Sequence, residues 1–361
     1  MIFLRNLLIF LVIVALFSLS NFNNQDRPTK DAVRSRNRSL AGEGRTSNYK
    51  TQITVKPYRF LKMLDSKKSQ EMIDLVHNIN LWILDDLSFP KKLDLFAVDQ
   101  FANAYFDTEE MALTLPYQFR FEHHTKHPLF TKYAWAHEYG HALFFENIKD
   151  IAPRFAQRYL ELTQKARTQN NDKEALQILY QEKSLTKVEY KAALKELELL
   201  NSSWRTEYEQ IGELLAPFDE YAADVVAAIH FSNSETMNDS LFYSYDAKKS
   251  GGDAEMRSFE RYKPSLAKKG MAYHTFFYKA RTELWKYCLN RPRRVEILRR
   301  VSRGKLLSLI FNGMGQLIEQ RYQQQKFSYT VEEHEKVNDL LWESIDANML
   351  DQNSGEELCG N

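Results

Sequence analysis

Apolar and polar positions change their period along the first third of the chain. Residues 66–86 carry apolar side chains at helical spacing, which predicts an amphipathic helix. The run LDLFAVD at 93–99 is typical of a buried strand. ANAYF at 102–106 and MALTLPY at 111–117 flank the polar residues DTEE and predict a hairpin, with Pro116 suited to the end of an edge strand. Strands and helices are therefore expected to alternate here.

The middle of the chain has a different pattern. Residues 153–200 are rich in Lys, Glu, Gln, Ala and Leu, which predicts two or three amphipathic helices. Breaks are expected at Asn170-Asn171 and at Ser184. A further short helix is expected to begin near Pro217.

The last third combines a polar segment with further helices. Residues 231–270 are polar, contain glycines at 251–252 and predict a long loop, of the kind that often forms a lid or a binding segment. Helical patterning resumes at 272, with breaks near 291–292 and 327–328. The expected fold class is therefore α+β and predominantly helical.

The N-terminus resembles an export signal. Arg5 precedes an apolar run at 7–17, and Ser18 and Ser20 provide a small-x-small cleavage site. The run is shorter than the roughly 20 residues that span a bilayer. Residues 1–20 are therefore interpreted as a signal peptide or a short uncleaved anchor. The chain is expected to be exported, whether periplasmic, secreted or membrane-anchored and facing outside the cytoplasm.

The next segment is expected to be a disordered tether. Between Phe22 and Lys50 there are seven Lys and Arg against three Asp and Glu, with few apolar residues to offset the entropy of ordering. Its basic character is compatible with an anionic membrane surface, although a solvated linker is the preferred interpretation. The chain is thus divided into an N-terminal segment, a tether, an α/β subdomain, a helical subdomain and a flexible tail, over residues 1–20, 21–50, 51–150, 151–348 and 349–361.

Composition narrows the class of protein. The 361 residues are 43% hydrophobic and 27% charged, as in soluble globular proteins. A net charge of +1 gives no reason to expect a nucleic acid partner. Two cysteines, Cys288 and Cys359, do not make a disulfide scaffold, and whether they pair is left open.

Residues 134–146 (AWAHEYGHALFFE) carry the candidate chemistry. His137 and His141 are four residues apart, so they share one face of a helix and can bind one tetrahedral metal ion. Glu138 can then act as general base toward a water that the metal activates. Gly140 costs the helix about 1 kcal/mol relative to Ala, which indicates close approach of a neighbouring element. The alternative is two histidines with satisfied hydrogen bonds on a buried helix.

A zinc hydrolase of this kind needs a third protein ligand. In the pattern HExxHxxGxxH the glycine would fall on Phe144 and the third histidine on Asn147, so that pattern is excluded. In the stretch PFDEYAADVVAAI, Glu220 and Asp224 share a helical face. Glu220 can ligate the metal, and Asp224 can accept the free ring N–H of a ligating histidine. An acidic first helical turn is the alternative interpretation, and Glu213 is the next candidate ligand.

The HEYGH motif with the downstream ExxxD motif resembles the gluzincin metallopeptidases, which include thermolysin-like and neprilysin-like enzymes. The resemblance implies a zincin-like core with a small sheet and an active-site helix, followed by a helical C-terminal domain. It also implies one zinc ion per chain, with His137, His141 and Glu220 as its ligands. Glu138 would be the catalytic base, and Asp224 would orient a ligand.

The resemblance covers roughly residues 93–229. ANAYF also resembles the strand of neprilysin-like enzymes that pairs with extended peptide, and residues 111–117 are expected to bind substrate by strand addition. His141 and Glu220 are 79 positions apart, far more than in thermolysin-like enzymes, and the helical segment 153–200 fills the gap. No subfamily is assigned.

Peptide hydrolysis also needs a donor to the tetrahedral oxyanion. Gluzincins supply one from downstream, and here Tyr273, His274 and Arg281 are available. His274, on the same helical face as Tyr278, is the favoured second catalytic residue, and a core histidine is the alternative. Arg281 can instead pair with a substrate carboxylate or with a structural acid. Three further histidines are interpreted as a solvated loop rather than a second metal site: His123, His124 and His127.

The leading hypothesis from the sequence is an exported zinc metallopeptidase that acts on a peptide or protein substrate. One alternative is a catalytically silent, zinc-stabilised binding or scaffold protein at the cell envelope. The intact Glu138 argues against it, because a structural site has no need of a base. The other alternative is a zinc hydrolase of a non-peptide amide, which the sequence does not exclude.

Overall fold

The computed structural model describes most of the chain between Lys50 and Met349, namely residues 50–56, 66–98, 104–116, 128–236, 257–260, 273, 276–298, 300–330 and 333–349. The expected export signal, the tether before Lys50, the three upstream histidines, most of the polar loop and the expected tail lie outside these ranges. The described residues divide into two compact units, Leu162–Glu207 in the smaller one and residues 50–161 with 208–349 in the larger one.

The fold is α+β and predominantly helical, with one small mixed sheet, as the sequence predicts. The sheet has the order β1-β2-β4-β3. Neighbouring strands β1, β2 and β4 are parallel, and β3 is antiparallel to β4. The strands span Gln52–Val55, Lys92–Val98, Tyr105–Asp107 and Ala112–Pro116 in chain order.

The expected hairpin is present as β3 and β4, but the expected position of its second strand is wrong. β4 is not an edge strand, because Ala112 pairs with Asp94 of β2 on one side and with Asp107 of β3 on the other. The hairpin places β3 outside and inserts β4 next to β2. Strand addition at β4 is therefore blocked along its paired length, and the edge strands among those described are β1 and β3.

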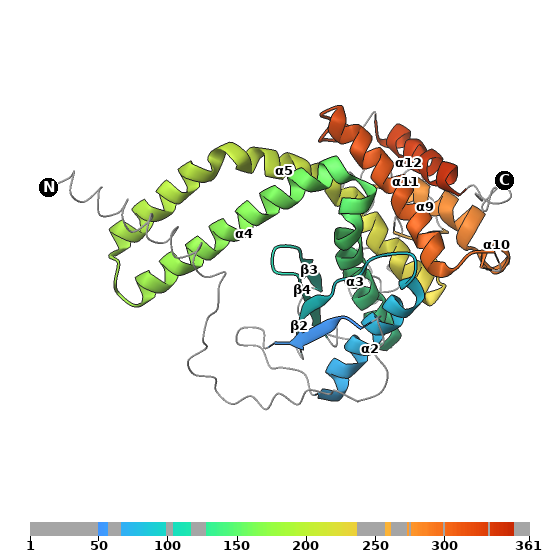
Figure 1. Cartoon of the computed structure of the whole chain (residues 1–361), viewed down its shortest axis with the longest axis horizontal. Coiled ribbons are helices and arrows are strands. Elements are labelled where there is room, and N and C mark those ends of the chain that lie inside the picture. Colours follow the sequence, from blue (N-terminus) through green and yellow to red (C-terminus); the bar gives the residue numbers. More distant parts are fainter. Residues whose placement is uncertain are drawn as a thin grey trace, which may run out of the picture. The chain divides into compact units, whose positions relative to one another are not determined.

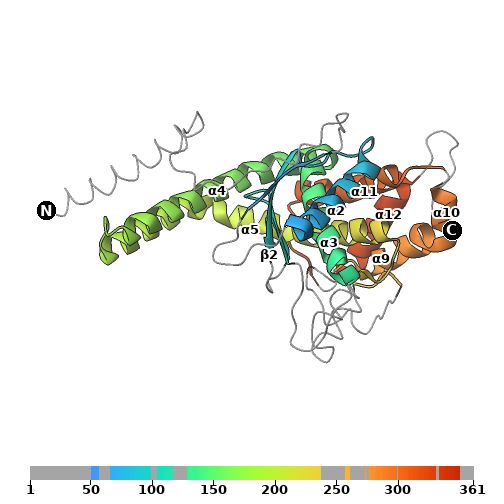
Figure 2. The same cartoon turned by 90° about the horizontal axis from the view of Figure 1, so that it is seen from below.

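Helices α2 (Ser66–Ile83), α3 (Pro128–Ile151) and α11 (Arg303–Gln323) lie on one side of the sheet (Figure 2). The expected helix over 66–86 is thus confirmed, three residues shorter. A buried polar network fixes α3 against α2 and the start of β1. The hydroxyl of Tyr139 donates to Oδ1 of Asn80, whose Nδ2 donates to Oγ1 of Thr51 at 2.9 Å.

The C-terminal helices follow the expected breaks. They are α9 (Tyr278–Leu284), the π-helical turn η2 (Trp285–Leu289), α10 (Arg291–Ile297), α11 and α12 (His334–Asn348). The helical structure is interrupted at Asn290, just before residues 291–292, and α11 ends before residues 327–328, as predicted. Helices α11 and α12 lie side by side (Figure 1). Within the described ranges, no helix combines the length and the apolar character needed to cross a bilayer.

The two long middle helices correct two expectations. α4 (Pro153–Gln181) runs through Asn170-Asn171, because the low helix propensity of asparagine costs under about 1 kcal/mol per residue. The break at Ser184 is confirmed, since α5 begins at Lys187. α5 does not begin at Pro217 but continues through it to Phe231. Because Pro217 has no N–H, the helix loses one hydrogen bond, the one to the carbonyl of Glu213. Glu213 is exposed, so water can take the place of that donor.

In the smaller unit, the end of α4 and the start of α5 pack around a turn. A small apolar cluster of Leu176, Ala193 and Leu197 holds them together. Thr186 and Glu189 cap α5 reciprocally, since the Thr186 N–H donates to Oε2 of Glu189 at 2.9 Å and the Glu189 N–H donates to Oγ1 of Thr186 at 3.3 Å.

His230 of α5 predicts a pH dependence of stability. Nε1 of Trp82 donates to Nδ1 of His230 at 3.2 Å, which requires a neutral imidazole. Burial, helped by the positive charge of Arg303, lowers the pKa of His230 from 6.5 to about 4. Between those values the unfolded chain binds a proton that the folded chain does not. His230 therefore stabilises the fold fully above about pH 6.5, and this contribution is lost as the pH falls to about 4, by about 3 kcal/mol in total.

The measurement is urea unfolding of parent and His230→Gln across this pH window, with a chelator present to keep both metal-free. Gln can still accept the Trp82 hydrogen bond but does not titrate. We expect the free energy of unfolding of the variant to fall less steeply with decreasing pH. Identical slopes in the two proteins would contradict this role for His230.

Candidate metal centre

The HEYGH motif lies in the middle of α3, a helix that is buried on nearly every side. His137, Glu138 and His141 retain 3%, 9% and 8% of their accessible surface. Polar side chains this deeply buried need partners inside the protein. Carboxylates of α5, which crosses α3 at the motif, lie beside both histidines.

Gly140 sets the distance between the two helices. A Cβ atom at this position would lie 2.7 Å from Cα of Ala223 and 3.1 Å from its carbonyl oxygen. The close approach that the sequence indicates for Gly140 is therefore confirmed, and the neighbour is α5. This crossing places Glu220 and Asp224, on the same face of α5, beside the two histidines.

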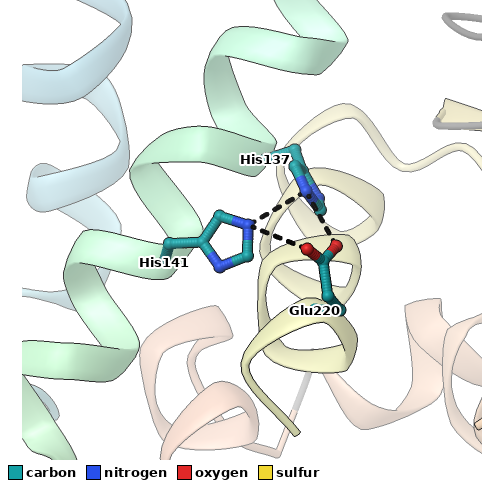
Figure 3. Close-up of side chains that lie close together, drawn as sticks. All are labelled: His137, His141 and Glu220. Carbon is teal, nitrogen blue, oxygen red and sulfur yellow. Dashed lines mark hydrogen bonds and ion pairs between the residues drawn. The ribbon is translucent and has the colours of Figure 1, made fainter. Parts of the chain in front are cut away.

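The side chains of His137, His141 and Glu220 point toward one another (Figure 3). The two Nε2 atoms are 3.1 Å apart. Oε2 of Glu220 lies 3.4 Å from Nε2 of His137, and Oε1 lies 3.9 Å from Nε2 of His141. Two ligands of one tetrahedral zinc ion are about 3.3 Å apart, given bond lengths near 2 Å. The three side chains therefore fit a single zinc ion without rearrangement of the helices.

Each histidine also has a carboxylate at its other ring nitrogen. Oδ1 of Asp224 lies 3.0 Å from Nδ1 of His137, so the contact that the sequence predicts for Asp224 is present. Oδ2 of Asp219 lies 2.9 Å from Nδ1 of His141, although the alignment there falls short of a hydrogen bond. A carboxylate that accepts a hydrogen bond at Nδ1 fixes the ring orientation, and both Nε2 atoms are directed toward the carboxylate of Glu220.

Two arginines complete the site, namely Arg281, for which the sequence left several roles open, and Arg257, which the sequence did not assign to it. Asp224 is fully buried and pairs with Arg281 of α9, whose Nη2 lies 2.5 Å from Oδ2. Arg257 lies 2.6 Å from Oδ1 of the same carboxylate through its own Nη2. Of the two partners left open for Arg281, the structural acid is thus the one observed. Oδ1 of Asn338 in α12 accepts hydrogen bonds from the N–H groups of Lys279 and Ala280, which fixes the start of α9.

The charges of this cluster shift several pKa values. Burial would raise the pKa of the Asp224 carboxyl, but Arg257 and Arg281 outweigh it and hold that pKa well below its usual range. Burial raises the pKa of Glu138. Burial would lower the pKa of His141, but Asp219 and the other carboxylates raise it to about 10.

The sequence reasoning missed Asp219 and Arg257. The position of Asp219 next to Glu220 was a weak indication that it belongs to the site. Arg257 carried no such indication, because the loop around it lacks any periodic pattern.

The remaining candidates of the sequence do not join the cluster. His274 lies outside the described residues, so the favoured oxyanion donor has no position here. Tyr273 is exposed, and Tyr278 packs against His334 at 5.3 Å between ring centroids. Glu213 is exposed two turns before Glu220. Asn147 instead binds both the N–H and the carbonyl of Ser88, which joins α3 to the loop before β2.

Comparison of the chain with protein-family models, with curated protein sequences and with solved structures finds no match.

Proposed function

We propose that this chain is a zinc-dependent metallopeptidase of the gluzincin type. The observation that carries the proposal is the convergence of His137, His141 and Glu220 from two helices, with Glu138 next to the first ligand. Export through residues 1–20 and one zinc ion per chain belong to the same proposal.

The charge of the cluster also favours a divalent cation. Four carboxylates, those of Glu138, Asp219, Glu220 and Asp224, share one electrostatic environment with two guanidinium groups. Ligation requires both histidines to be neutral, and in that state the equivalent of two negative charges is left over in the site. In the metal-free protein, the ring proton that the raised pKa of His141 retains offsets part of this excess, and a bound metal cation would take the place of that proton. Zinc matches the excess in charge, and it prefers imidazole and carboxylate ligands.

The proposed mechanism assigns one task to each group. Zinc, when bound, supplies a Lewis acid that polarises the scissile carbonyl and acidifies a water molecule. Glu138 accepts the proton of the attacking water and passes it to the leaving amine. Its pKa, raised by burial, brings the carboxyl closer to the value at which it can both take and return a proton near neutral pH. Asp224 holds the imidazole of His137 in the orientation that ligation requires, and Asp219 places a negative charge beside Nδ1 of His141.

The test of the site is its zinc content. We expect about one zinc per chain in the full-length parent after reconstitution, and a marked loss in Glu220→Ala, measured by elemental analysis of folded protein. Glu213→Ala is the matched control, since it removes the same group from an exposed position on the same helix. Absence of zinc from the parent would exclude the proposal. Full retention by Glu220→Ala would exclude Glu220 as a ligand.

A further inference from the structure

Arg257 places a guanidinium directly against the candidate metal ligands. Its Nη2 lies 3.3 Å from Oε2 of Glu220, the oxygen that faces Nε2 of His137. The same Nη2 lies 3.2 Å from Nε2 of His137 and 3.3 Å from Nδ1. A single nitrogen of Arg257 thus contacts one expected ligand oxygen and the ring of one expected ligand histidine.

The rest of the described segment 257–260 holds Arg257 in this position. Ser258 donates its hydroxyl to Oε1 of Glu235 just after α5. The N–H of Phe259 donates to the carbonyl of Ser234 at 3.0 Å, and its buried ring packs near Trp285. Arg257 itself keeps only 5% of its accessible surface. Its charge is therefore a fixed part of the site and is weakly screened by solvent.

A fixed cation beside a metal site acts in two opposite ways. Without metal, Arg257 partly neutralises Glu220 and Asp224, which would otherwise repel one another in a buried environment. With metal, the same charge repels the incoming cation, and the guanidinium competes with it for Oε2 of Glu220. The two effects together favour the metal-free state.

We infer that Arg257 is a built-in cation that holds the metal-free site assembled and lowers its affinity for a divalent metal. The inference rests on the proposed metal site and adds that the ion is held less tightly than its three protein ligands alone would allow. The metal is then exchangeable, and the fold does not depend on it.

The experiment compares parent, Arg257→Gln and Arg154→Gln as full-length chains. Arg154 is the matched control, because its side chain is 74% exposed and lies 3.9 Å from its acidic partner. The dissociation constant for zinc is measured by competition with a chromophoric chelator, and the stability of the metal-free protein by urea unfolding. We expect Arg257→Gln to bind zinc at least about tenfold more tightly and to unfold at lower urea without metal. Arg154→Gln should match the parent in both.

Ser258→Ala provides a second route to the same answer if Arg257→Gln does not fold. It keeps the guanidinium but removes the hydroxyl contact to Glu235, so its zinc affinity should lie above that of the parent. An unchanged or weaker affinity in folded Arg257→Gln, or an unchanged one in Ser258→Ala, would overturn the inference and leave the metal site intact. A parent that binds no zinc would overturn the proposed function together with the inference.

Discussion

Glu138→Gln is expected to lower the rate of peptide hydrolysis about a hundredfold to ten-thousandfold while leaving the zinc content unchanged. The carboxamide has nearly the shape of the carboxylate but cannot accept the proton of the attacking water. Glu138 is not among the three side chains that converge as ligands, so ligation should survive the change. Turnover is measured on a quenched-fluorescent peptide library, beside elemental analysis of the same preparations.

Glu146→Gln is the control for that experiment. It makes the same chemical change one and a half turns beyond His141 on α3, where Glu146 pairs with Lys149 at the surface. Its turnover should equal that of the parent. Hydrolysis that persists at the parental rate in Glu138→Gln would show that another group moves the proton, or that the activity lies elsewhere.

Asp224→Asn is expected to cost about 3–5 kcal/mol of unfolding free energy in the metal-free protein. The carboxylate and the guanidinium of Arg281 are both fully buried, and Arg257 pairs with the same carboxylate. The amide removes the negative charge and leaves two guanidinium groups without compensation in the interior. Urea unfolding in the presence of a chelator measures the loss.

Asp339→Asn is the control for this second prediction. Asp339 pairs with Lys279, but its side chain is 46% exposed, so the change should stay within about 1 kcal/mol. A loss as small in Asp224→Asn would mean that solvent or a rearranged neighbour neutralises the two arginines. Asp224 would then matter only for the orientation of His137.

Two of the three corrected features of the fold have a common origin. The sequence predicts the hairpin of β3 and β4 because the strand period and the turn are local signals. The parallel pairing of β4 with β2 joins strands that are not consecutive in the chain, so no local signal predicts it. In the same way, Pro217 is a local stop signal for helices, yet the buried side chains of Leu214 and Phe218 on either side hold α5 together through it. In both places, long-range packing outweighs a local preference.

The sequence by itself determines which side chains share one face of a helix. The four-residue spacings of His137 with His141 and of Glu220 with Asp224 place each pair on one face wherever the helices go, because the period of 3.6 is a property of the backbone. Only the tertiary structure decides that these faces meet. The meeting depends on the crossing of α3 and α5, where Gly140 contacts Ala223, 83 positions further along the chain. It also depends on Arg257 and Arg281, which reach Asp224 from segments whose local patterns carry no trace of that contact.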